Sequence, residues 1–166
     1  SVQGDREVLA IFRGFGAQIA EKWGELHCYA SPLHGMDIDA SQIPDLVPIL
    51  AVTAATAVGV TRIYNAGRLR LKESDRLEAV ARCLSLLGAK VQELPDGLII
   101  EGVPKLTGGE VPGYHDHRMV MSMAVAALSC QEPVVVTDAE SVAKSWPSFF
   151  EDYQAIGGNV HVVHDR

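Results

Sequence analysis

The chain has 166 residues, of which 48% are hydrophobic and 21% charged, which is ordinary for one globular domain with its own core. Its net charge of −7 excludes general nucleic-acid binding, so any bound anion must be held by a local group of cations. No apolar run is long enough to cross a bilayer, and Cys28, Cys83 and Cys130 have neither zinc nor disulfide spacing, which indicates reduced, mostly buried thiols of a cytoplasmic protein.

The first predicted element is an amphipathic helix that begins near Asp5-Arg6. Its apolar positions recur at helical spacing: Val8, Phe12 and Phe15. Gly16 follows, where a helix C-cap is normally found. Strand-like alternation then leads through Trp23-Gly24, a pair that predicts the turn of a β-hairpin.

Residues 45–58 predict a helix that is apolar or small on nearly all sides and is therefore expected to be buried. A strand is predicted after it, at residues 60–65. Asp45 stands at the start of this helix, where free backbone N–H groups and the positive end of the dipole attract anions. An N-cap role explains Asp45 equally well.

Residues 68–76 are the densest cationic stretch of the chain. In an extended backbone Arg68, Arg70 and Lys72 point to one side. Once a helix begins, Lys72 and Arg76 are four residues apart and share a face, with Glu73 beside them. Such a group can hold a phosphate and a carboxylate while one acid stays within reach of a proton.

From Asp75-Arg76 the pattern of the first helix repeats and ends at Gly88. Its apolar stripe is formed by Leu77, Val80 or Ala81, Leu84 and Leu87. Pro95-Asp96-Gly97 then predicts the turn of a second hairpin. A helix without a polar face follows at residues 117–128, and a strand at residues 134–138.

Asp116-His117-Arg118 stands at the start of that buried helix, about one repeat length after Asp45. The two clusters are therefore expected at equivalent places in the fold. Lys144 lies in the loop before a third amphipathic helix, which leads to Gly157 and to a last predicted strand at residues 160–163.

The repeated unit is a strand, a buried helix, a strand, an amphipathic helix and a hairpin. This predicts a single α/β domain over residues 1–166 with sheets outside and helices inside. Its units cover residues 1–30 (partial), 31–101 and 102–166. Because the chain starts at Ser1 in the middle of a unit, we expect the natural protein to extend upstream.

Each polar cluster also has a plainer interpretation. The cationic stretch fits a solvated helix start capped by Ser74 or Asp75, and Asp116 fits an N-cap. A loop lysine such as Lys144 is usually exposed without a role. No metal site is expected at His115-Asp116-His117, because no further ligands of matching type lie nearby in the sequence.

Several of these stretches, in this order, resemble signatures of the EPSP synthase family of enolpyruvyl transferases. They are Asp37-Ile38-Asp39, Ile43-Pro44-Asp45, Arg70-Leu71-Lys72-Glu73-Ser74-Asp75-Arg76, Asp116-His117-Arg118-Met119 and Ala143-Lys144-Ser145-Trp146-Pro147. The resemblance is collinear over nearly the whole chain. It implies an inside-out barrel of β-α-β-α-β-β units, as the C-terminal half of a two-domain enzyme.

The resemblance also implies a reaction. The enolpyruvyl group of phosphoenolpyruvate would be transferred to the 5-hydroxyl of shikimate-3-phosphate, with release of phosphate and without a cofactor or a metal. One proton must leave the hydroxyl while another reaches the methylene carbon. The fragment alone is expected to be inactive, because its partner is the absent N-terminal domain; the full-length enzyme is expected to be monomeric.

The family's site residues carry over one by one. Asp45 and Lys72 resemble the groups at the reacting hydroxyl, and Glu73 the proton exchanger at the methylene carbon. Phosphoenolpyruvate would be bound by four residues: Arg76, His117, Arg118 and Lys144. At the shikimate side Arg68 stands where relatives carry other polar residues, and His115 is a second departure, so contacts at both positions stay open.

Three alternatives remain. The first is UDP-N-acetylglucosamine enolpyruvyl transferase, which shares the chemistry and the architecture but is expected to have other motifs. The second is a non-enzymatic anion- or RNA-binding module, which the acidic charge and the lack of an aromatic stacking platform disfavour. The third is a degenerate half kept only as a structural piece.

Overall fold

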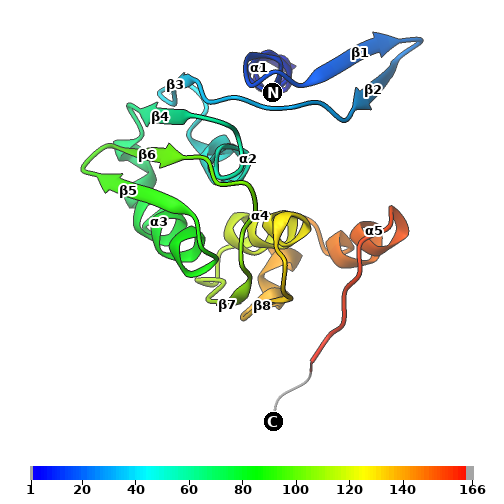
Figure 1. Ribbon diagram of the computed structural model, residues 1–166. Helices are drawn as coiled ribbons and strands as arrows, with labels where there is room; N and C mark the ends of the chain where they lie inside the picture. The colour runs from blue at the N-terminus through cyan, green and yellow to red at the C-terminus, as the bar shows by residue number, and fades with distance from the viewer. Residues whose placement is uncertain (1, 164–166) are drawn as a thin grey trace.

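The computed structural model describes residues 2–163, with side chains from residue 6 onward, so the side chain of Asp5 lies outside the described residues. Its first part consists of α1 (Val2–Gly14), β1 (Gln18–Lys22) and β2 (Glu25–Tyr29). The two strands are antiparallel and turn at Trp23-Gly24, as the sequence predicts. Figure 1 shows this helix and hairpin along the top of the molecule.

The middle part forms a four-stranded sheet in the order β3-β4-β6-β5. Its elements are β3 (Asp37–Asp39), the 3₁₀ turn η1 (Pro44–Leu46), α2 (Val47–Ala54), β4 (Val60–Tyr64), η2 (Gly67–Leu71), α3 (Arg76–Leu86), β5 (Lys90–Leu94) and β6 (Gly97–Glu101). β3 and β4 are parallel because α2 returns the chain between them, whereas β6 pairs antiparallel with both β4 and β5.

The last part repeats this order with a smaller sheet. Its elements are β7 (Gly109–Val111), α4 (His117–Ala126), η3 (Ala127–Ser129), β8 (Val134–Val136), η4 (Ala139–Lys144) and α5 (Phe149–Ala155). β7 and β8 are parallel and joined through α4, as β3 and β4 are joined through α2. In Figure 1 the three sheets follow one another around the outside, from the top over one side to the bottom.

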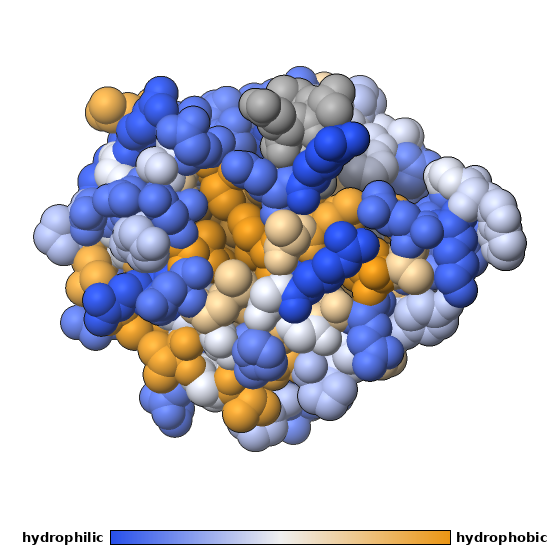
Figure 2. Space-filling view, turned by 90° about the horizontal axis from the view of Figure 1, so that it is seen from above, coloured by the Kyte–Doolittle hydropathy of each residue, from blue (hydrophilic) through white to orange (hydrophobic). Residues whose placement is uncertain are grey.

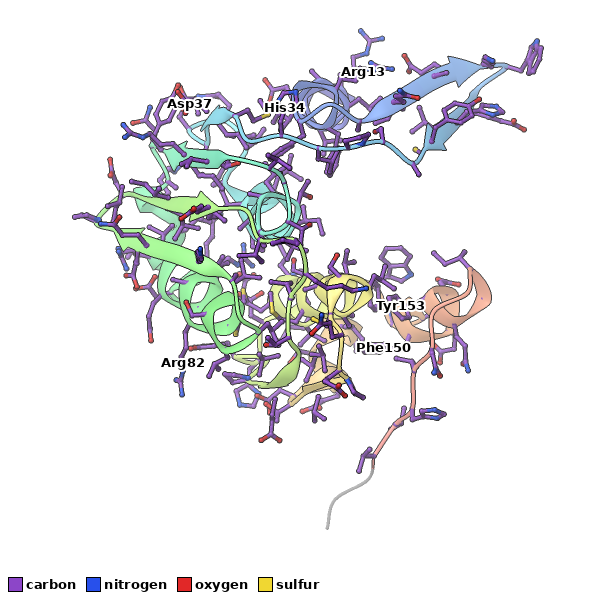
Figure 3. All side chains as sticks on the ribbon, in the orientation of Figure 1. Arg13, His34, Asp37, Arg82, Phe150 and Tyr153 are labelled. Carbon is purple, nitrogen blue, oxygen red and sulfur yellow. The ribbon has the colours of Figure 1, made fainter. Side chains whose placement is uncertain are left out.

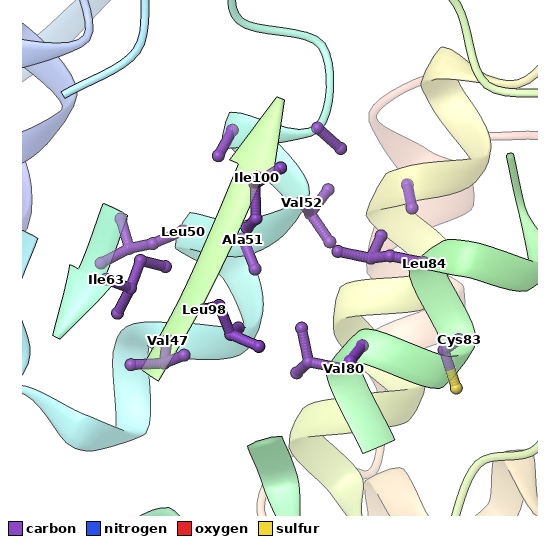
Figure 4. Close-up of a cluster of buried hydrophobic side chains, with 14 of the residues drawn as sticks. Val47, Leu50, Ala51, Val52, Ile63, Val80, Cys83, Leu84, Leu98 and Ile100 are labelled. Atoms are coloured by element: carbon purple, nitrogen blue, oxygen red, sulfur yellow. The ribbon is translucent and has the colours of Figure 1, made fainter. Parts of the chain in front are cut away.

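The core lies between the middle sheet and the helices. Figure 4 shows α2 side chains on both sides of this helix: Leu50 lies beside Ile63 of β4, and Val52 lies toward Leu84 of α3. Leu50, Ile63 and Leu98 are fully buried there. β4 alternates between exposed and buried residues, so its sheet has one face toward the helices and one toward solvent. The predicted mixed α/β arrangement, with helices inside and sheets outside, is confirmed.

The three amphipathic helices end in the same way. Each is followed by a glycine with positive φ, at Gly16, Gly88 and Gly157. In each case the N–H of the next residue donates to the carbonyl five residues back: Ala17 to Phe12, Ala89 to Leu84 and Gly158 to Tyr153. This is the Schellman cap, so the predicted C-caps are confirmed, and their shared geometry is what the proposed repeat predicts.

Two local predictions are wrong. Residues 68–71 are not extended and only Lys72 is; the chain turns through η2, because fully buried Leu69 anchors the turn in the core. Residues 160–163 form no strand, since no strand of the described part pairs with them. The buried helices are also shorter than predicted, with a 3₁₀ turn before α2 and another after α4.

α5 packs against α4 in a small hydrophobic cluster that includes Val120, Phe149 and Tyr153. α5 is held to α4 by Tyr153, whose hydroxyl donates to the Ala124 carbonyl at 2.9 Å (Figure 3). Figure 2, which looks down on the side of α1 and the hairpin, shows hydrophobic residues exposed between hydrophilic ones. None of the helices in the described part has both the length and the apolar character needed to cross a bilayer.

All three cysteines are free, but only Cys83 is buried, so the expectation that these thiols are mostly buried is wrong. Cys28 is exposed on β2, whereas Cys83 is buried on α3 with its thiol 3.5 Å from the Pro112 carbonyl. Burial raises the pKa of the Cys83 thiol to about 12.

Candidate functional site

Polar side chains from three helix starts meet at one place. Asp45 lies in η1 immediately before α2, Arg76 is the first residue of α3, and Asp116 is the N-cap of α4. The repeat explains why they meet: α2 and α4 are equivalent buried helices that pack against each other, and α3 contacts both. The expected equivalence of the Asp45 and Asp116 clusters is therefore seen in space.

Arg76 is the centre of this group, and its side chain is only 1% exposed. It pairs with Asp116 through two bonds, from Nε to Oδ2 at 2.8 Å and from Nη2 to Oδ1 at 3.2 Å. Nη1 donates to Asp45 at 3.0 Å, and Nη2 also donates to Glu73 at 2.5 Å. A planar guanidinium thus holds three carboxylates from three segments, which a lysine ammonium cannot do in this geometry.

Asp116 is fully buried and has two structural tasks. Its Oδ1 accepts from the Arg118 backbone N–H at 3.0 Å, which confirms the predicted N-cap. Its Oδ2 accepts from the Ser74 hydroxyl at 2.8 Å, beside Arg76. Burial by itself would raise the pKa of Asp116, but the bonds from Arg76 and Ser74 outweigh it and leave the pKa below the ordinary value.

Asp45 is not an N-cap, since its side chain makes no capping bond at η1 or α2. Its carboxylate instead faces three cations: Arg76 at 3.0 Å, Lys72 at 3.3 Å and Arg118 at 3.9 Å. Partial burial acts to raise the pKa of Asp45, but Arg118 and the other two cations lower it overall. The carboxylate is 46% exposed, so it is both charged and accessible.

Lys72 precedes α3 rather than lying on it, so the predicted helical face shared with Arg76 is wrong. Both side chains nevertheless reach the same oxygen of Asp45. Arg118 is anchored nearby through Nη1, which donates to the Asp45 carbonyl at 3.1 Å. Three cations and three acids, counting Glu73 and Asp116, therefore balance one another in this group.

His117 and Lys144 border the group. Nε2 of His117 lies 3.8 Å from the Glu73 carboxylate, and its Nδ1 contacts the Ser145 hydroxyl. Lys144, in the last turn of η4, donates to the His115 carbonyl. Among residues 6–163 Lys144 makes no ion pair, so its charge is not neutralised by a carboxylate. It is therefore exposed, as the plainer interpretation expects, but its ammonium is held beside the start of α4.

Arg68 and Arg70, by contrast, stay outside the group. Arg68 is exposed and forms no ion pair within the described residues. Arg70 connects α3 to the β5–β6 hairpin: it pairs with Asp75 and Glu93, both at 2.9 Å, and donates to the carbonyls of Leu94 and Pro95. Asp75 is the N-cap of α3, so this part of the cationic stretch is a capped, salt-bridged helix start.

Replacing Arg70 with Ala should lower the free energy of unfolding by about 1 kcal/mol, because two partly exposed ion pairs and two bonds to carbonyls are lost. Urea unfolding followed by circular dichroism measures the change. Arg68→Ala is the matched control and should leave the midpoint unchanged. Equal destabilisation by both substitutions would contradict the assigned role of Arg70.

Two clusters contain three possible metal ligands each: Glu73, Asp116 and His117, and His115, Asp138 and Glu140. In the first, Glu73 and Asp116 are already bound by Arg76, whose positive charge opposes a cation. In the second, His115 and Glu140 are exposed, and exposed acids of this kind commonly bind no ion. The positive charge of Arg76 therefore disfavours a metal ion at the first cluster.

The sequence did not indicate the roles of Ser74 and Ser145, nor that Asp116 is the main partner of Arg76. The Asp116–Arg76 and Ser74–Asp116 contacts join residues about 40 positions apart, and no helical or strand periodicity links such residues. Only the repeat, which makes the starts of α2 and α4 equivalent, pointed to their proximity.

Comparisons with known proteins agree with this geometry. The family model described as "EPSP synthase (3-phosphoshikimate 1-carboxyvinyltransferase)" matches residues 1–153. A 3-phosphoshikimate 1-carboxyvinyltransferase of Clostridium acetobutylicum is 52% identical over 161 residues, which cover 97% of this chain and 37% of the relative. One of Methanococcus aeolicus is 44% identical over 163 residues, covering 98% of this chain and 38% of the relative.

Solved structures give the same picture. An EPSP synthase structure from Acinetobacter baumannii aligns with a TM-score of 0.84 and 32% identity, over 95% of this chain and 40% of that one. The enolpyruvyl transferase NikO from Streptomyces tendae aligns with a TM-score of 0.75 at 20% identity, covering 92% of this chain and 35% of NikO, which shows a shared fold. The chain thus spans less than two fifths of the length of the curated relatives described above.

Proposed function

Because this chain belongs to the EPSP synthase family, we propose that it supplies the C-terminal half of an enolpyruvyl transferase site. The reaction joins the enolpyruvyl group of phosphoenolpyruvate to the 5-hydroxyl of shikimate-3-phosphate and releases phosphate. The observation that carries the proposal is the convergence of Asp45, Glu73 and three cations at the starts of α2, α3 and α4.

The proton transfers are assigned to the two accessible acids. Asp45 carries no proton beside Lys72 and is accessible, so it can accept one from the attacking hydroxyl, while the same cations lower its basicity. Glu73 has one carboxylate oxygen near Arg76 and the other near His117, so its second oxygen is available for the methylene carbon. Both acids are 46% exposed, as contact with a substrate requires.

Phosphoenolpyruvate is assigned to Arg76, Arg118, His117 and Lys144. Arg118 is 37% exposed and Lys144 is exposed, so both can bind an incoming anion directly. Arg76 is already occupied by Asp116, Asp45 and Glu73. It can bind the substrate carboxylate only if Asp45 or Glu73 releases an N–H. Binding at Arg76 is therefore an exchange of carboxylates. Shikimate-3-phosphate is assigned to Asp45 and Lys72, with Arg68 as a further contact outside the group.

The proposal needs a second half. Half of a site leaves the reactants open to water and without the groups that orient them on the other side. The partner is therefore the remaining domain of the same enzyme, in a monomer of the cytoplasm that uses no cofactor or metal and binds neither nucleic acid nor membrane. The relatives described above give no support to a UDP-N-acetylglucosamine transferase or to an RNA-binding module.

Phosphate release from phosphoenolpyruvate and shikimate-3-phosphate tests the proposal. The chain alone should release no phosphate. The chain combined with the part of the Clostridium acetobutylicum relative that it does not match should release phosphate. In that combination Glu73→Gln should slow release by roughly 100-fold or more, the usual contribution of a general acid or base.

The outcomes separate the parts of the proposal. Equal turnover by the chain alone would contradict the half-site, and a folded but inactive combination would contradict the transfer reaction. Turnover with UDP-N-acetylglucosamine in place of shikimate-3-phosphate would support the alternative transferase.

A further inference from the structure

The last residue of η4, Lys144, and the residue after it, Ser145, both contact the segment where α4 begins. Lys144 donates to the His115 carbonyl, and the Ser145 hydroxyl contacts Nδ1 of His117. The backbone there is fixed, because the N–H groups of Ser145 and Trp146 both donate to the Val142 carbonyl, at 3.1 and 2.7 Å. The backbone that carries the Ser145 side chain is therefore fixed to the end of η4.

The ring of His117 lies between Ser145 and Glu73. Its side chain is 14% exposed, its Nδ1 faces the Ser145 hydroxyl, and its Nε2 faces the Glu73 carboxylate at 3.8 Å. A neutral imidazole has one N–H donor and one acceptor nitrogen. Which nitrogen carries the proton is set by the partner of the other nitrogen.

Glu73 determines which tautomer of the His117 ring is favoured. Its carboxylate accepts a bond from Arg76, and an oxygen of a carboxylate favours an N–H on the facing nitrogen of His117. With the proton on Nε2, Nδ1 must accept, and Ser145 offers the only contact there with a donor hydrogen within the described residues. If the ring is protonated on both nitrogens, the same hydroxyl accepts instead.

We propose that Ser145 is a positioning residue that holds the His117 ring, with its Nε2–H toward Glu73, through the hydroxyl bond to Nδ1. The kinetic consequence rests on the function proposed above, in which Glu73 exchanges a proton with the substrate. The same bond keeps Lys144 beside the start of α4, since the two residues are adjacent.

The Ser145 hydroxyl is not needed to hold the loop between η4 and α5 in place, because this loop is also attached to α5. Asp152 on α5 accepts from the Trp146 indole N–H at 2.8 Å and from the Ser148 hydroxyl at 2.9 Å. The path of the loop is thus kept without Ser145. Ser148 also provides a matched control, because it is a serine of the same loop whose hydroxyl does not contact His117.

The ring nitrogens of His117 report the bond directly. In the ¹⁵N-labelled chain at about pH 8.5, where an ordinary histidine is neutral, long-range proton–nitrogen correlation should show one tautomer with the proton on Nε2. His117→Gln assigns the signals. Ser145→Ala should move both nitrogen shifts toward those of the exposed His161, whereas Ser145→Thr and Ser148→Ala should keep the original pattern.

Unchanged shifts in Ser145→Ala, or an equal change in Ser148→Ala, would overturn the proposal. This measurement needs no substrate, so it succeeds or fails independently of the transfer reaction. In the combination with the remainder of the relative, Ser145→Ala should lower kcat by roughly tenfold with KM for shikimate-3-phosphate unchanged. A full kcat in Ser145→Ala would show that the bond has no part in catalysis.

Discussion

Replacing Arg76 with Met should lower the free energy of unfolding at neutral pH by about 3–5 kcal/mol, the usual cost of removing one partner from a buried ion pair. The variant keeps a side chain of similar length but leaves Asp116 fully buried without its cation. Asp45 and Glu73 lose a common partner as well, although both are half exposed and can turn to water. Urea unfolding at pH 7 measures the loss.

The pH dependence of that loss identifies its cause. In the native chain the pKa of Asp116 is lowered, so its contribution to stability is present above the unfolded pKa and disappears as the pH falls through the folded value. In Arg76→Met the bonds and charge of Arg76 are lost, while burial still acts to raise the pKa of Asp116 and only the bonds from Ser74 and the Arg118 N–H still lower it, so the pKa rises relative to the native chain. The difference between the two proteins should therefore shrink as the pH is lowered from 7 toward about 4, the ordinary range of an aspartate.

Two further variants control this experiment. Arg76→Met with Asp116→Asn removes the stranded charge and should recover a large part of the lost stability at pH 7. Arg76→Lys keeps the positive charge but not the planar guanidinium that forms two bonds with Asp116. Its free energy of unfolding should lie between those of the native chain and Arg76→Met. A pH-independent loss, with no recovery in the double variant, would mean that packing rather than charge is responsible.

Asp45→Asn should strengthen the binding of inorganic phosphate to the chain by roughly tenfold or more. The carboxylate now lies within 4 Å of three cations and competes with any incoming anion. A unit charge at this distance interacts by about 1 kcal/mol in water and more near a protein surface. Removing it frees Lys72 and Arg118. Isothermal titration with phosphate measures the change.

The charge-matched control is Asp39→Asn. Asp39 lies on β3, where its carboxylate bonds Ser41 and Asn65, and the substitution changes the net charge of the chain by the same amount. Phosphate binding should change little in this variant. Equal strengthening of phosphate binding in both variants would show a general charge effect. Weaker phosphate binding in Asp45→Asn would show that Asp45 holds the cations in place for the anion and does not compete with it.

Much of the fold was predictable because the repeat and the helix periodicity both follow from local sequence. The glycines at 16, 88 and 157, the two hairpin turns and the two buried helices are each determined by a few neighbouring residues. The failures have a different origin. Arg68 to Lys72 alternates like a strand, yet the burial of Leu69 favours a turn, and burial depends on residues far along the chain.

The candidate site shows the same division. The residue types at the starts of the helices were identified correctly, but not how they are paired. Arg70 binds the β5–β6 hairpin, Lys72 lies partly exposed beside Asp45, and Arg76 is buried and paired with three acids. Nothing in their spacing distinguishes them, because each assignment depends on which other segment lies opposite.

The buried thiol of Cys83 can be used to measure the opening of α3. A thiol with a pKa near 12, enclosed on α3, has almost no thiolate at neutral pH and no access to a dissolved electrophile. The exposed thiol of Cys28 on the hairpin has no such protection. Alkylation of Cys83 thus requires α3 to open, so its labelling rate measures how readily this helix leaves the native core.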